Sequence, residues 1–95
     1  MTLGDASLER EILTLFGMQA AELIGALGAL PVDAADLAHK LKGSARAIGA
    51  FQVADAAENF ELALRNGGGA SETLTALELA VAQARTAIDV LLRQP

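Results

Sequence analysis

The sequence predicts an all-α fold, an antiparallel up-and-down bundle of four helices. Ala and Leu, which favour helix, supply 37 of the 95 residues, whereas the β-branched Val and Ile supply only four each. Three breaks that contain Gly or Pro, at 28–31, 49–51 and 67–69, divide the chain into four segments. Because the breaks are short, neighbouring helices are expected to run antiparallel. A chain of 95 residues is expected to form a single domain over residues 1–95.

We expect the first helix at residues 6–29 and the second at 33–48. Asp5 or Ser7 can cap the first helix, and its apolar residues recur mostly at helical spacing. The second helix begins near Asp33, which is an acceptable cap after the first break.

The third helix is expected at residues 51–66, ending before Gly67, and the fourth at 71–94, with Ser71 as its cap. The third helix should bury one narrow apolar stripe, formed by Val53, Ala57, Phe60 and Leu64.

The second helix separates an apolar face from a face that carries the only histidine. Its core face is expected to hold Leu37, Leu41, Ser44 and Ile48, with Ala34 and Ala45 at the margin. His39 lies on the other side, and Lys42 and Arg46 follow it at i+3 and i+7. We therefore expect His39 to be exposed and flanked by cations.

Gly43 requires an explanation, because a glycine inside a helix costs about 1 kcal/mol relative to alanine. It stands at i+4 from His39, where the lack of a side chain leaves space for an incoming phosphoryl donor. Lys42 can then neutralise the oxygens of the transferred group, and Arg46 can add a second cation.

A neutral imidazole has an unshared electron pair on one ring nitrogen, so near pH 7 it can attack phosphorus without a general base. One histidine is therefore enough to accept a phosphoryl group. The face of the helix alone leaves a second interpretation open at even odds, an ordinary surface histidine among solubilising charges.

The order of residues around His39 supports the first interpretation. Residues 38–45 read AHKLKGSA, and 48–50 read IGA. This order resembles the signature of histidine-containing phosphotransfer (HPt) domains, usually written His-x-Leu-Lys-Gly-Ser with Leu-Gly-Ala shortly after. Residues 60–61 and 65–67 are similar to the acidic and basic positions of that family at the end of its third helix.

The resemblance implies a four-helix bundle whose exposed histidine takes a phosphoryl group from one receiver aspartate and gives it to another in a multistep phosphorelay. His39 would be the phosphoacceptor, supported by Lys42 and Gly43. Arg65 would help to complete the site from the third helix, with Glu61 as a further candidate. The alternative interpretation of Arg65 is a solvated i+4 partner of Glu61.

The implied partners are response-regulator receiver domains and a hybrid histidine kinase. No metal ligands lie near His39 in the sequence, so we expect magnesium on the partner receiver domain and no cofactor or metal on this chain. The protein is expected to be a phosphocarrier without independent turnover, because its active site is shared. We expect a monomer, and leave open a dimer through the Ala-rich helices.

A receiver that docks near His39 needs an apolar centre with a polar rim. The first helix has more apolar residues than one face can bury, so Leu13, Phe16 and Met18 are candidates for the docking patch. The alternatives are a broad buried face or a dimer contact. Leu62, on the third helix, is a further exposed candidate.

Composition argues against several other classes of protein. A net charge of −5 and the lack of a basic stripe oppose nucleic-acid binding. The absence of cysteine removes disulfides and thiolate zinc sites and fits a cytoplasmic location. No membrane span is expected, because Gln19 and Glu22 interrupt the most apolar stretch, 16–32, and residues 1–7 lack the basic start of a secretory signal.

Two other functions are open to a protein with the same residues. The first is a non-phosphorylated helical adaptor that binds receiver-type partners, and it is the main alternative. The second is a small hydrolase with His39 as a base, which would need a concave pocket with a nucleophile or metal close by.

Overall fold

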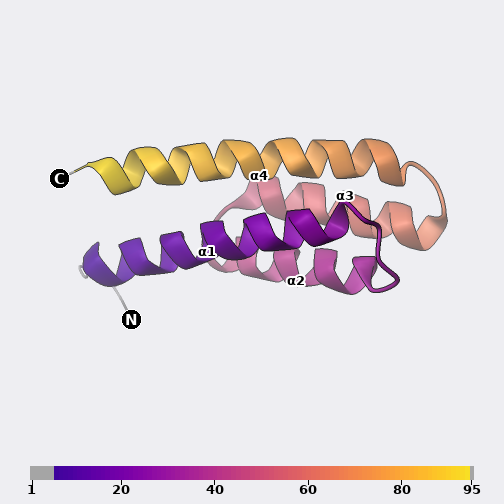
Figure 1. Cartoon of the computed structure of the whole chain (residues 1–95), viewed down its shortest axis with the longest axis horizontal. Helices are drawn as coiled ribbons and strands as arrows, with labels where there is room; N and C mark the ends of the chain where they lie inside the picture. The colour runs from indigo at the N-terminus through magenta and orange to yellow at the C-terminus, as the bar shows by residue number, and fades with distance from the viewer. Residues whose placement is uncertain (1–5, 95) are drawn as a thin grey trace.

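The computed structural model of the protein describes residues 6–94, so Asp5, one candidate cap, lies outside the described residues. Within these residues the chain forms four helices and no strand (Figure 1). They are α1 (Ala6–Leu27), α2 (Ala34–Ala47), α3 (Phe51–Asn66) and α4 (Ala70–Arg93). Successive helices run in opposite directions, which confirms the expected antiparallel bundle. No helix within residues 6–94 combines the length and apolar character that a membrane span requires.

The first break ends α1 at Leu27, two residues earlier than expected. Leu30 in this turn has a φ of 47°, a left-handed value that is uncommon outside glycine. It precedes Pro31, and the residue before a proline is kept out of the helical region by contact with the proline ring. The chain therefore turns before α2 begins after Asp33, which occupies the N-cap position without a side-chain hydrogen bond.

The glycine run ends α3 and begins α4. Gly67 adopts a φ of 75°, and its N–H donates to the carbonyl of Ala63 at 2.9 Å, which satisfies one of the last carbonyls of α3. Gly69 adopts a φ of 76° and caps α4, so Ser71 lies inside the helix instead of capping it. Glycine takes these positive φ values at little steric cost, which explains why two glycines stand here.

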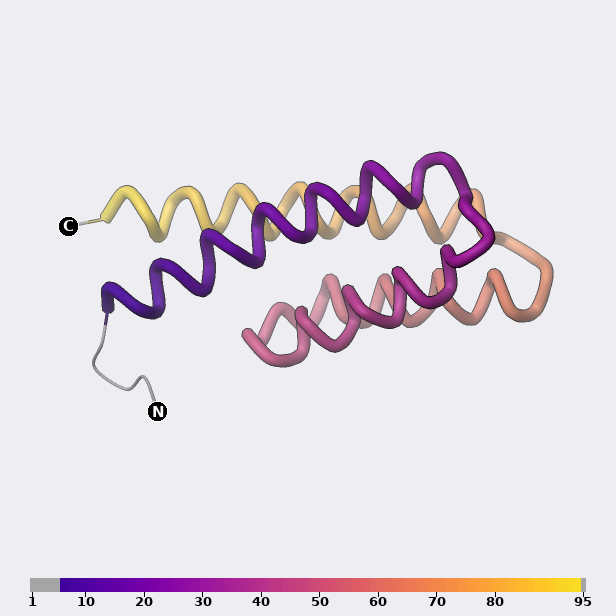
Figure 2. Tube along the Cα trace, turned by 60° about the horizontal axis from the view of Figure 1, so that its bottom comes forward, coloured from indigo at the N-terminus to yellow at the C-terminus, as the bar shows by residue number. Residues whose placement is uncertain are grey.

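The four helices surround one core in two layers, α1 with α4 and α2 with α3 (Figure 2). Each helix contacts the one before and the one after it, and α1 also contacts α4. All four contribute to the centre, where the largest fully buried side chains are Phe60, Leu27, Leu41, Leu77 and Val53.

The α1–α4 layer is longer than the α2–α3 layer. Helices α1 and α4 have 22 and 24 residues, whereas α2 and α3 have 14 and 16. At about 1.5 Å per residue the first layer extends about 12 Å further, which is visible at the chain ends in Figure 2. Leu8 and Ile12 belong to the apolar residues that recur at helical spacing in α1, but each is 38% exposed, because they lie in this extension. The buried stripe of α1 consists of Phe16, Ala20, Leu23 and Leu27.

The core face of α2 is turned toward α3 compared with the sequence expectation. The fully buried residues are Ala34, Ala38, Leu41 and Ala45, whereas Leu37, Ser44 and Ile48 are only half-buried. Small alanines face α3, which allows the two helices to approach closely. This rotation brings Lys42 to the boundary between the two helices and leaves His39 outside it.

Candidate functional site

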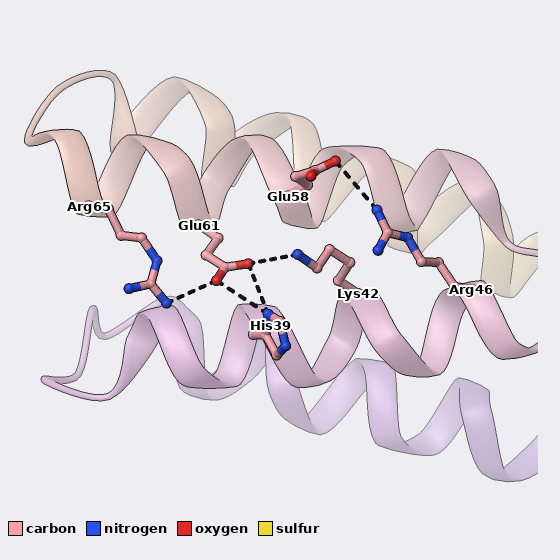
Figure 3. A network of polar contacts seen from close by, with 6 residues as sticks. All are labelled: His39, Lys42, Arg46, Glu58, Glu61 and Arg65. Carbon is pink, nitrogen blue, oxygen red and sulfur yellow. Dashed lines mark hydrogen bonds and ion pairs between the residues drawn. The ribbon is translucent and has the colours of Figure 1, made fainter.

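His39 lies near the middle of α2, and its side chain is 65% exposed. The ring leans over the boundary between α2 and α3 rather than standing away from the bundle (Figure 3). The neighbouring helix therefore supplies the contacts that orient the imidazole.

Glu61 on α3 lies at the centre of the cluster around His39 (Figure 3). Nδ1 of His39 is 3.3 Å from both carboxylate oxygens of Glu61. Nζ of Lys42 is 3.2 Å from Oε1, and a guanidinium nitrogen of Arg65 donates to Oε2 at 3.0 Å. Glu61 is only 7% exposed, so one buried carboxylate receives two cations and the histidine.

The environment keeps Glu61 ionised. Burial alone would raise the pKa of its carboxyl group. Hydrogen bonds from Arg65, Lys42 and His39, together with the charge of Lys42, outweigh this effect and lower the pKa below its usual value of 4.5. Glu61 is therefore a carboxylate at neutral pH, and it can only accept hydrogen bonds.

This carboxylate determines which nitrogen of His39 carries the proton. Because Glu61 can only accept, Nδ1 of a neutral His39 must donate, and the proton sits on Nδ1. The unshared pair is then on Nε2. No residue of the described range 6–94 forms a hydrogen bond or ion pair with Nε2, and the side chain that carries it is 65% exposed. The site therefore presents a fixed, accessible nucleophilic nitrogen.

Lys42 and Arg46, expected together on the exposed face, lie in different surroundings. The side chain of Lys42 is only 13% exposed, because it runs along the boundary with α3 to reach Glu61. Arg46 is 52% exposed and pairs with Glu58 at 3.5 Å, further along the same boundary. Figure 3 shows the guanidinium of Arg46 directed to Glu58 on α3, and Arg46 makes no hydrogen bond or ion pair with the residues around His39 that the structure describes.

Gly43 leaves open space beside His39. A Cβ added at this position would meet no atom within 4 Å. Packing inside the protein therefore does not require a glycine here, although it costs helix stability. Arg65, on the other side of the ring, forms the i+4 pair with Glu61 that the sequence allowed, and its side chain remains 55% exposed.

The expected docking residues are divided between the two layers. Phe16 is only 4% exposed, and this candidate is wrong, because it belongs to the core stripe of α1. Leu13 is half-buried against the core, whereas Met18 is 58% exposed; both line a small groove between α1 and α4, in the layer opposite His39. Leu62 is 49% exposed on α3 and follows Glu61 directly.

A larger groove of about 490 Å³ lies at the turn between α2 and α3, under the extension of α4. Its lining runs from Ile48 to Val53 and includes Leu13, Ala84, Ile88 and Leu91, among other apolar residues and two glutamines. None of the lining residues is ionisable, so this groove offers no acid, base or nucleophile. Within residues 6–94 there is likewise no group of three or more His, Cys, Asp or Glu that could hold a metal ion.

Sequence reasoning named Glu61 only as a further candidate and missed its central position. The available signal was its placement on the core side of α3, where an acidic residue needs partners to be buried. His39, Lys42 and Arg65 could be these partners. The sequence does not show that they are, because it does not give the relative rotation of α2 and α3.

Comparison with known proteins gives one result that covers most of the chain. The model of the Hpt domain family matches residues 11–92, a range that includes all of α2 and α3 and most of the other two helices. Neither the curated proteins nor the solved structures that were searched gave a match. The exposed histidine, the Lys and Gly that follow it and the four-helix architecture agree with this assignment, and the chain therefore belongs to the Hpt domain family.

Proposed function

We propose that this domain carries a phosphoryl group on Nε2 of His39 and relays it between the aspartates of receiver domains. The observation that carries the proposal is the contact between Nδ1 of His39 and the Glu61 carboxylate, which leaves the Nε2 electron pair free and exposed. A nucleophile prepared in this way needs no general base.

The transfer proceeds by displacement at phosphorus. The Nε2 electron pair forms the N–P bond while the P–O bond to the receiver aspartate breaks, and the aspartate carboxylate leaves with the bonding electrons. The proton on Nδ1 stays in place while the N–P bond forms, and Glu61 stabilises the positive charge that develops on the ring in this step. In the donation step the N–P bond breaks, and the ring recovers its electron pair as a neutral imidazole.

Lys42 and Arg65 are linked to the ring through their shared partner Glu61, and they would neutralise the phosphoryl oxygens. Gly43 would let the receiver approach the face of α2 beside His39. The acceptor aspartate and its magnesium ion would belong to the receiver, so that the complete active site forms only in the complex.

The partners that fit this role are response-regulator receiver domains and a hybrid histidine kinase, and we place the domain in the cytoplasm with them. The support is the family assignment together with the absence of cysteine.

Incubation with a phosphorylated receiver domain tests the proposal. The protein should acquire a base-stable, acid-labile label, and His39→Gln should abolish it while circular dichroism shows an unchanged fold, since the side chain is 65% exposed. A protein that binds the receiver with no transfer of label would instead be a non-phosphorylated adaptor. Label that survives His39→Gln would contradict the assignment of the phosphoacceptor.

A further inference from the structure

The charge around His39 is nearly balanced before any phosphoryl group arrives. The ionisable groups beside the ring are Lys42 on its own helix and Glu61 and Arg65 on α3. Two cations and one carboxylate leave a net charge of about +1, against a phosphoryl group that carries up to two negative charges. The site therefore neutralises the transferred group only in part.

Both cations are already engaged by Glu61. Lys42 contacts Oε1 at 3.2 Å and Arg65 contacts Oε2 at 3.0 Å, and the carboxylate is almost inaccessible to water. Phosphoryl oxygens on Nε2 must compete with this carboxylate for the same two donors. A buried carboxylate that loses its hydrogen-bond donors has a higher free energy, because its charge is then unpaired. The competition therefore raises the free energy of the phosphorylated state.

The hydrogen bond between His39 and Glu61 adds to this effect whenever the phosphorylated ring is neutral. A neutral ring phosphorylated on Nε2 has no proton on Nδ1, so Glu61 then faces an electron pair instead of a donor. A carboxylate can only accept, and the contact becomes repulsive. A glutamine in its place could turn its amide and donate to Nδ1.

We propose that Glu61 is a positioning residue that keeps phosphorylated His39 high in free energy, and so favours passing the phosphoryl group on over retaining it. This inference rests on the proposed function, because it concerns the same histidine. It assigns to Glu61 an effect on the equilibrium of transfer, in addition to its effect on the orientation of the ring.

The equilibrium can be measured without a receiver by using phosphoramidate as the donor. The N–P bond of phosphoramidate breaks, a new N–P bond forms at Nε2 of His39, and ammonia leaves. The ratio of phosphorylated to free protein is read by intact mass spectrometry at fixed phosphoramidate and ammonium concentrations, and it is approached from both directions. The measurement is made at pH 8.5, at which an isolated imidazole is uncharged.

Glu61→Gln should raise the phosphorylated fraction, with an equilibrium constant about tenfold higher than that of the wild type. Glu61→Asp keeps the charge and should stay close to the wild type. Glu58→Gln is the matched control, because Glu58 is on the same helix and pairs with Arg46 away from the ring.

An equal or lower equilibrium constant for Glu61→Gln would overturn the inference, as would an equal rise in Glu58→Gln. Thermal melts of all variants exclude unfolding as the cause of a difference. The two proposals fail separately: if no receiver phosphorylates His39, the relay is contradicted while the phosphoramidate equilibrium can still be measured. If receivers do phosphorylate it and Glu61→Gln leaves the equilibrium unchanged, only the role of Glu61 is contradicted.

Discussion

Nζ of Lys42 lies 3.2 Å from Oε1 of Glu61, across the boundary between α2 and α3. This contact joins the helix that carries the histidine to the helix that orients it. The pair between Arg46 and Glu58, at 3.5 Å, makes a second link further along the same boundary. The cluster around His39 therefore depends on how these two helices are aligned.

Replacing Gly43 by alanine should make the fold more stable and phosphoryl transfer slower. A Cβ at this position meets no atom within 4 Å, so Gly43→Ala should stabilise the fold by about 0.5–1 kcal/mol through helix propensity. The added methyl group lies beside His39 and should slow transfer from a receiver at least tenfold. Urea denaturation and transfer kinetics on the same sample measure both effects. Transfer at the wild-type rate would show that the glycine does not serve the approach of a partner.

Lys42→Gln should slow phosphoryl transfer by about tenfold to a hundredfold, because a cation beside the developing charge is removed. Arg46→Gln is the comparison, since Arg46 pairs with Glu58 and not with Glu61, the partner of His39. It should lower the rate less than threefold. Rapid-quench measurements with one phosphorylated receiver give both rates. Equal losses in the two variants would contradict the division of roles that the structure indicates.

The contribution of Glu61 to stability should depend on pH. Its pKa is lowered in the folded protein, because the hydrogen bonds from Arg65, Lys42 and His39 outweigh its burial. The folded state therefore binds fewer protons than the unfolded chain near the usual pKa of 4.5. The stabilisation is complete well above that value and is lost as the pH falls through the lowered pKa.

Urea denaturation of the wild type and Glu61→Gln from pH 3 to pH 7 measures this dependence. The wild type should be more stable by about 2 kcal/mol at pH 7, and the difference should narrow as the solution is acidified. A difference that is constant over this range would mean that the charge of Glu61 does not contribute.

Leu62 and Met18 test where a receiver docks. Both side chains are exposed, at 49% and 58%, but Leu62 is in the α2–α3 layer with His39 and Met18 borders the groove between α1 and α4. Leu62→Ala should weaken receiver binding by about 1 kcal/mol or more, and Met18→Ala should weaken it less. Isothermal titration calorimetry compares the two, and a larger loss in Met18→Ala would move the docking surface to the α1–α4 layer.

The helices were predictable because their signals are local. Gly67 ends α3 at the expected residue, since a left-handed turn favours glycine wherever the helix packs. The buried face of α1 was harder, because its apolar residues outnumber the positions of one face. Periodicity alone could not choose Phe16 over Leu8 for the core. That choice depends on where α2 ends, which is a tertiary property.

In the candidate site too, the part that lies on one helix was predictable and the contact between helices was not. His39, Lys42 and Gly43 follow one another on a single helix, so their relative positions come from helical geometry. Glu61 belongs to another helix, and its contact with His39 depends on the rotation of α2 and α3 about their axes. Alanines at 38 and 45 set that rotation by allowing close approach, and no residue near Glu61 in the sequence reports it.

The length difference between the two layers has a consequence for how such a domain can change. Within residues 6–94, the polar cluster of His39, Lys42, Glu61 and Arg65 lies entirely on the short hairpin of α2 and α3, which is one contiguous piece of the chain. The longer helices α1 and α4 complete the core but contribute no side chain to the polar cluster (Figure 3). The reacting hairpin and the surrounding scaffold are thus separable by two cuts in the gene. The helices that complete the core could therefore be exchanged while the chemistry of the hairpin stays intact.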